Sequence, residues 1–130
     1  MKIKYLSLLL GVWLGCALTA LAADAPARTG KLNHVVSFKF KETATPSQIH
    51  QVEAAFRDLK TKIKEIRSYE WGTNVSSEKH DKGFTHGFIL TFRTEKDRNA
   101  YLVHPDHQAF GKMLGPILGD VFVIDFWSEK

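Results

Sequence analysis

The sequence predicts an α+β domain whose elements follow the order strand, helix, strand, strand, helix, strand. Three observations support this prediction. Apolar residues alternate in several segments, as they do in strands, and recur every three or four residues in others, as they do in helices. The last predicted strand is apolar on both faces, which indicates a sheet that is covered on both sides. The length of 130 residues corresponds to a single domain.

The N-terminal segment is predicted to lie outside this fold. Lys2 and Lys4 precede an apolar stretch that ends at Ala20-Leu21-Ala22, which is the pattern of a cleaved secretory signal. We therefore expect the mature protein outside the cytoplasm, in the periplasm or secreted. The expected organisation is a signal peptide over residues 1–22, a linker over residues 23–30 and one folded domain over residues 31–130.

Cysteine use and charge exclude several classes of protein. The only cysteine, Cys16, lies in the predicted signal, so the exported domain has no disulfide and no cysteine-ligated metal. A lipid anchor at Cys16 is the less favoured alternative, because Trp13 is bulky and the apolar run continues beyond the cysteine. Cleavage would remove Lys2 and Lys4 and lower the formal net charge of +4 by two. We expect no nucleic-acid partner and no membrane span after the signal.

The first strand and the first helix have clear local signals. Residues 33–41 alternate and place His34 on an apolar face with Val36. A helix start follows, in which Thr45 caps, Pro46 takes the first position and Gln48 completes a capping box. Apolar residues then recur at helical spacing and predict one buried stripe, made of Ile49, Val52, Phe56, Leu59, Ile63 and Ile66.

The second and third strands are predicted over residues 69–76 and 84–94, with a charged loop between them. The third strand places a second histidine, His86, on an apolar face together with Phe88. A helical segment then begins near Thr94 and breaks at His104-Pro105, because the residue before a proline disfavours the helical conformation. The helix is predicted to restart and to continue to about residue 118.

The last strand, over residues 121–127, predicts a partner. It is apolar on both faces, and Asp125 is its only charged residue. Two helices can cover only one face of a four-stranded sheet, so another surface must cover the second face. The simplest solution is a homodimer in which two sheets pack face to face.

Several strings of residues then resemble one known family. They are Asn33-His34-Val35-Val36, Trp71-Gly72-Thr73-Asn74-Val75, Gly83-Phe84-Thr85-His86 and Tyr101-Leu102-Val103-His104-Pro105-Asp106-His107, followed by Asp125. Over residues 31–127 the chain resembles the stress-responsive dimeric α/β-barrel (Dabb) domain family. The resemblance implies a ferredoxin-like β-α-β-β-α-β protomer that forms a dimeric α/β barrel. The family includes a plant polyketide cyclase and heat-stable plant stress proteins that assemble into rings.

The resemblance to the cyclase implies a site. Its catalytic tyrosine and histidine match Tyr101 and His107, which implies His107 as general base and Tyr101 as the group that polarises a substrate carbonyl. Its other pocket-associated histidines match His34 and His86. Imidazole can accept a proton near neutral pH and a phenol can stabilise an enolate oxygen, so the reaction would need no cofactor. The expected ligand pocket, for a small apolar carbonyl compound, consists of His34, His86, Phe88 and Trp71.

Three functional hypotheses stay open. The leading one is an exported barrel protein that binds a small molecule in an apolar cavity. The others are a cofactor-independent aldol cyclase or lyase with His107 as base, and a structural stress protein that assembles through its sheet. His34 and His86 could equally be hydrogen-bonded core histidines, and His104 could cap the helix break. A metal site at His104 and His107 lacks further ligands, and haem lacks an attachment motif, so we expect neither metal nor cofactor.

Overall fold

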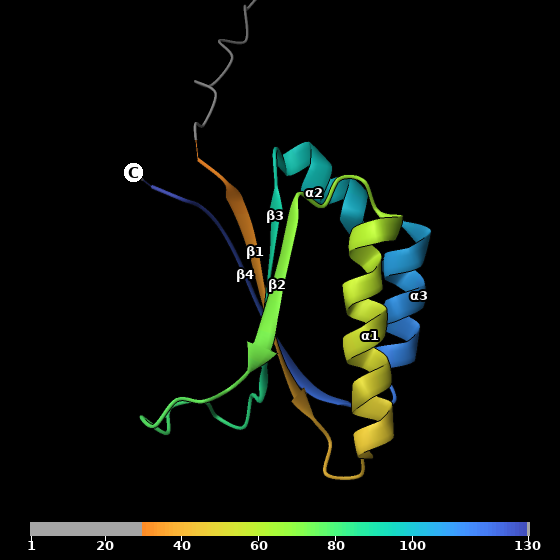
Figure 1. The fold of residues 1–130 in the computed structure, drawn as a ribbon, viewed down its shortest axis with the longest axis vertical. Helices are drawn as coiled ribbons and strands as arrows, with labels where there is room; N and C mark the ends of the chain where they lie inside the picture. Colours follow the sequence, from red (N-terminus) through yellow and green to blue (C-terminus); the bar gives the residue numbers. More distant parts are fainter. Residues whose placement is uncertain (1–29, 130) are drawn as a thin grey trace, which may run out of the picture.

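The computed structural model describes residues 30–129 (Figure 1). The predicted signal peptide, the linker before Gly30 and Lys130 lie outside the described residues. The predicted order of strands and helices is confirmed, with the second helical segment divided in two. The elements are β1 (Leu32–Phe40), α1 (Pro46–Lys62), β2 (Ser68–Thr73), β3 (His86–Phe92), α2 (Glu95–Leu102), α3 (Pro105–Leu114) and β4 (Leu118–Trp127).

The strands form one antiparallel sheet in the order β2-β3-β1-β4. Helices α1 and α3 lie side by side on one face of this sheet, and α2 lies near one end of it (Figure 1). The loop between β2 and β3 extends on the opposite side, away from the helices (Figure 1). We call the face without helices the open face. The core lies between the sheet and the helices, and aromatic rings from Phe38, Phe56, Phe88 and Phe110 meet there.

Helix α1 begins as the sequence predicts. The Thr45 side chain accepts a hydrogen bond from the Gln48 backbone N–H, and the Gln48 side chain accepts one from the Thr45 backbone N–H. The helix ends at Lys62, so Ile63 and Ile66 belong to the connection that leads to β2. Both are nevertheless buried, because this connection packs beneath the end of the helix and continues its apolar stripe.

The two middle strands are shorter than the sequence predicts. β2 ends at Thr73 and β3 begins at His86. In the loop between them, Asn74 Oδ1 accepts from the Ser76 backbone N–H at 2.9 Å, and Asp81 Oδ1 accepts from the Gly83 backbone N–H at 2.7 Å. Side chains that bind the local backbone in this way compete with the strand ladder and end it.

Strand β4 is apolar on both faces, as predicted. In its register with β1, Asp125 lies opposite His34 and Val123 lies opposite Val36, so these β4 residues share the helix face. Phe122, Ile124 and Phe126 occupy the open face. Five apolar residues in the middle of β4 are between 44% and 48% exposed in the protomer, namely Val121, Phe122, Val123, Ile124 and Phe126. The helix layer therefore leaves much of this strand uncovered.

The helix break has the predicted cause. His104 is the N-cap of α3, and its Nδ1 accepts a hydrogen bond from the Asp106 backbone N–H at 3.2 Å. Pro105 takes the first helical position, where a missing N–H costs nothing. No helix within residues 30–129 is long and apolar enough to cross a membrane.

Candidate functional site

The two residues expected to be catalytic lie next to each other. Tyr101 stands near the end of α2 and His107 in the first turn of α3. Their ring centroids are 4.3 Å apart, because the chain turns at the His104-Pro105 break between the two helices. The His34 ring, from β1, lies 5.6 Å from the Tyr101 ring. Tyr101 is only 1% exposed, so the cluster lies between the sheet and the helices.

The contacts of His107 determine which nitrogen carries its proton. His107 Nδ1 lies 3.2 Å from the Leu102 carbonyl oxygen, and a carbonyl can only accept, so Nδ1 carries the hydrogen. Burial lowers the pKa of His107, which keeps the ring neutral and leaves a lone pair on Nε2. Burial raises the pKa of Tyr101, so its hydroxyl stays protonated and can donate.

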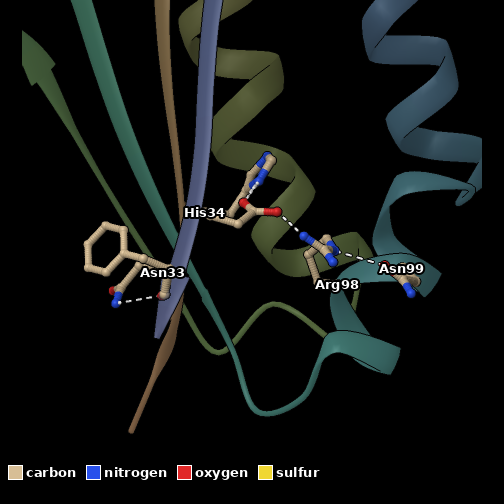
Figure 2. Close-up of polar contacts among 6 residues, drawn as sticks. Asn33, His34, Arg98 and Asn99 are labelled. Carbon is tan, nitrogen blue, oxygen red and sulfur yellow. Dashed lines mark hydrogen bonds and ion pairs between the residues drawn. The ribbon is translucent and has the colours of Figure 1, made fainter. Parts of the chain in front are cut away.

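Asp125 links the sheet to α2 beside the Tyr101 and His107 pair. His34 Nδ1 lies 2.6 Å from Asp125 Oδ1, and Arg98 Nη1 donates to Asp125 Oδ2 (Figure 2). Arg98 Nε also donates to Asn99 Oδ1 at 2.8 Å. Because a carboxylate accepts, His34 donates from Nδ1 and its Nε2 has a lone pair. Burial, with the Arg98 charge, lowers the pKa of His34 to about 4, so this ring is also neutral at pH 7.

His86 lies apart from these residues. Its strand partner is Phe38, which is four residues along β1 from His34, a separation of about 13 Å. His86 Nε2 lies 3.0 Å from Glu53 Oε1 of α1, and Nδ1 lies 2.8 Å from Thr85 Oγ1. Both ring nitrogens therefore have protein partners. The ring also stacks against Trp71, with centroids 6.2 Å apart.

A hollow of about 910 Å³ lies between the open face and the loop that joins β2 to β3. Three of the four residues expected to form a ligand pocket border it, namely Trp71, His86 and Phe88. Strand register places all three on the helix face, and His86 and Phe88 are buried there, so these two side chains point toward the helices and not into the hollow. His34, Tyr101 and His107 do not border the hollow. The residues that the resemblance implies for one cavity thus lie in two separate parts of the molecule. Other bordering residues include Val35, Ile89, Phe84 and Phe122, with Asn74, His80 and Lys82 from the loop.

Sequence patterns did not identify the partners that orient these histidines. Arg98 stands three residues before Tyr101 on the same helix, and Glu53 stands on the first helix among other charged residues. The one available signal was Asp125, a lone charge in an apolar strand. The sequence also gave no indication about Tyr69, whose Oη is the one buried side-chain polar atom within residues 30–129 without a hydrogen-bond partner.

The described residues also bear on a metal site. Among residues 30–129, no group of three or more His, Cys, Asp or Glu side chains could hold a metal ion. His104 and His107, which share a spacing of three, have other contacts: His104 caps α3 and His107 binds the Leu102 carbonyl.

Comparison with known proteins gives consistent matches. Residues 32–128 match the family model described as the stress responsive A/B barrel domain. The stress-response A/B barrel domain-containing protein HS1 of Arabidopsis thaliana is 31% identical over 97 residues, covering 75% of this chain and 89% of that protein. Olivetolic acid cyclase of Cannabis sativa is 24% identical over 99 residues, covering 76% of this chain and 98% of the cyclase.

Solved structures match the fold. A protein of Arabidopsis thaliana superposes with a TM-score of 0.72 at 29% identity, covering 76% of this chain and 96% of that one. A dimeric ferredoxin-like protein of Thermobifida fusca gives a TM-score of 0.66 at 27% identity, covering 77% of this chain and 93% of that one. The hydroxynitrile lyase of Passiflora edulis gives a TM-score of 0.73 at 24% identity, covering 78% of this chain and 95% of the lyase. It therefore shares the fold. The predicted ferredoxin-like α+β fold is thereby confirmed.

Proposed function

The chain belongs to the stress responsive A/B barrel domain family, and from this premise we propose that it is a homodimer that binds a small, largely apolar carbonyl compound. The hollow on the open face is the observation that supports binding. Its volume of about 910 Å³ is within the range of small-molecule sites, and aromatic residues border it. Asn74, His80 and Lys82 from the loop add hydrogen-bond donors for the oxygen atoms of such a ligand.

The homodimer forms through the open face. Structural neighbours of the same fold are described as dimeric, which supports this arrangement. The half-exposed apolar residues of β4, such as Phe122 and Ile124, would be covered by the second sheet. The same contact would enclose the hollow between the two copies, so that bound ligand is shielded from water.

The binding proposal can be tested with prodan, a fluorescent naphthyl ketone whose emission shifts to the blue in apolar sites. Gly87 borders the hollow, and a Cβ there meets nothing within 4 Å, so Gly87→Leu would fill the hollow with little strain elsewhere. We expect wild-type protein to bind prodan and Gly87→Leu to bind at least tenfold more weakly. Gly111→Leu is the matched control, because Gly111 is equally unobstructed but lies on α3.

Two results would contradict the binding proposal. One is the absence of a prodan shift with wild-type protein. The other is equal affinity of the Gly87→Leu and wild-type proteins. Sedimentation of each variant shows whether it is still dimeric, which separates a blocked hollow from a lost interface.

A second function is supported by the Tyr101 and His107 pair, namely a cofactor-independent cyclase or lyase reaction. His107 Nε2 removes a proton from a carbon next to a carbonyl, while the Tyr101 hydroxyl donates to the carbonyl oxygen. The enolate carbon attacks a second carbonyl of the same molecule, and the new alkoxide takes the proton back from His107. The similarity to olivetolic acid cyclase supports this chemistry.

Proton exchange tests this second function without knowledge of the natural substrate. We expect the protein to accelerate deuterium uptake next to the carbonyls of 2,6-heptanedione in D₂O, followed by proton NMR. His107→Ala should return the rate to that of buffer while the dimer persists, and Tyr101→Phe should slow it roughly 100-fold. His50→Ala is the control, because His50 is exposed on α1. Equal rates for His107→Ala and wild type, or lost thermal stability alone, would assign His107 a structural role.

Export is part of the proposed function. The basic residues and apolar run within residues 1–22 support cleavage after Ala22 and release outside the cytoplasm. Mass spectrometry of the protein from the periplasm or medium of an expressing bacterium would show the mature N-terminus at Ala23. A lipid-modified Cys16 at the N-terminus would instead support the membrane-anchored alternative.

A further inference from the structure

One carboxylate is shared by a cation and an imidazole at the edge of the Tyr101 cluster. Asp125 Oδ2 accepts a hydrogen bond from Arg98, and Asp125 Oδ1 accepts one from His34 at 2.6 Å (Figure 2). The three residues come from α2, β4 and β1, so the contacts tie the helix that carries Tyr101 to the sheet. The side chains of Arg98 and Asp125 are 19% and 25% exposed, and that of His34 is 6% exposed. The His34 ring is therefore shielded from solvent, whereas the Arg98–Asp125 contact is partly exposed.

We propose that Arg98 is a positioning residue: by neutralising Asp125, it holds His34 as a neutral hydrogen-bond donor whose Nε2 lone pair stays free beside Tyr101. The functional meaning of this inference rests on the chemistry proposed for Tyr101 and His107. The state of His34 itself can be measured without any substrate.

The charges around His34 determine its protonation state. The groups that face it are Asp125 from β4, Arg98 and Tyr101 from α2, and His107 from α3. A carboxylate alone at 2.6 Å would favour the imidazolium form, which carries protons on both nitrogens and has no lone pair. The Arg98 guanidinium compensates that carboxylate, and its own positive charge opposes a second cation nearby. Burial acts in the same direction, because it penalises the charged ring.

Arg98 also restricts the geometry. Its two contacts, to Asp125 and Asn99, hold the guanidinium between the sheet and α2. In this arrangement Asp125 Oδ1 accepts from His34 Nδ1, which selects the Nδ1–H tautomer. A lysine at this position would keep the charge but lose the paired donors of the guanidinium fork.

Nitrogen-15 NMR of the histidine rings tests the proposal directly, because it reports the pKa and the tautomer of each imidazole. In wild-type protein we expect His34 in the Nδ1–H form with a pKa near 4. Arg98→Met should raise the His34 pKa by roughly 1–3 units, since the carboxylate is then uncompensated. Arg98→Lys should give a smaller rise. Arg93→Met is the matched control, because Arg93 is exposed beyond the end of β3.

A double variant keeps the test decisive even if one substitution disturbs the fold. In Arg98→Met with Asp125→Asn, no carboxylate faces His34, so its pKa should fall back toward the wild-type value. An unchanged His34 pKa in Arg98→Met, or an equal rise in Arg93→Met, would overturn the proposal. These outcomes do not depend on proton exchange with 2,6-heptanedione. If the protein does not accelerate this exchange but the histidine pKa values and tautomers are as expected, the result counts against the proposed chemistry. It leaves the role of Arg98 unaffected.

Discussion

Single residues in the core show how buried polar groups are satisfied. His34 and His86 face the apolar interior, and each has a carboxylate partner, Asp125 or Glu53. The Thr91 and Ser68 hydroxyls pair with each other at 2.5 Å. Tyr69 is different, because its buried Oη has no partner among the described residues. A buried polar group without a partner costs free energy, so this position lowers the stability of the fold.

Tyr69→Phe is therefore expected to raise the free energy of unfolding by about 1 kcal/mol. The phenyl ring keeps the contacts with Phe56 and Phe88, and only the unsatisfied hydroxyl is lost. Urea unfolding followed by circular dichroism measures the change. Thr91→Val provides the contrast, since it removes a hydroxyl that has a partner and should destabilise. A loss of stability in Tyr69→Phe would contradict this view of the Tyr69 hydroxyl.

The protonation of His34 makes stability depend on pH. Its pKa is about 4 in the folded protein and near 6.5 in the unfolded chain. Between these values the unfolded chain binds a proton that the folded protein does not, so the free energy of unfolding falls as the pH falls. The full effect is on the order of 3 kcal/mol, reached near pH 4.

Urea unfolding at pH 7.0 and 4.5 measures this dependence. His34→Leu should reduce the loss of stability on acidification, whereas His50→Leu, at an exposed position on α1, should leave it unchanged. Burial also lowers the pKa of His107, so the free energy of unfolding of the His34→Leu variant should still fall somewhat as the pH falls. Identical pH dependence in His34→Leu and wild type would show that the His34 ring is not held neutral.

At the scale of secondary-structure elements, the short helix α2 carries much of the candidate site. It has only eight residues, yet it supplies both Arg98 and Tyr101. A helix of this length is marginal by itself, so its end contacts matter. Thr94 caps it and accepts from the Asp97 backbone N–H at 3.0 Å, while the His104 N-cap begins the next helix. The two caps determine where the chain turns and thus bring Tyr101 to His107.

Loss of the α2 cap is expected to disturb the site as well as the fold. Thr94→Ala should lower the free energy of unfolding by about 1 kcal/mol, because one backbone N–H loses its partner. The His34 and His107 ring signals in the NMR spectrum should shift with it, since Arg98 is on the same helix. Thr94→Ser keeps the hydroxyl acceptor and should behave like wild type. Equal stability of the alanine and serine variants would show that the cap contributes little.

At the scale of the whole molecule, the layers are asymmetric. Helices cover one face of the sheet (Figure 1). The open face keeps apolar side chains at partial exposure. Strand β4, at the edge of the sheet, is partly exposed on both sides. Such a surface favours association, and the proposed homodimer buries it through two equivalent sheets.

Ile124→Asp is expected to disrupt this association. Ile124 is 44% exposed on the open face, and a twofold interface would bury the introduced charge twice. Sedimentation velocity should show a dimer for wild type and at least tenfold weaker association for the variant. Val103→Asp is the control, at an exposed apolar position after α2. A dimer in both variants would place the interface elsewhere, and particles larger than a dimer in the wild type would favour the structural assembly hypothesis.

By itself, the sequence determined the order of the elements, the buried faces of β1 and β3, the cap of α1 and the break at His104-Pro105. These features depend on neighbours within a few residues, and local periodicity encodes them. Only the tertiary structure brought Asp125 to His34 and Arg98, separated His86 from Tyr101, and located the hollow on the open face. Such pairings depend on strand register and on how the helices dock. The packing of the whole domain determines both, because residues distant in the chain must bury their surfaces together.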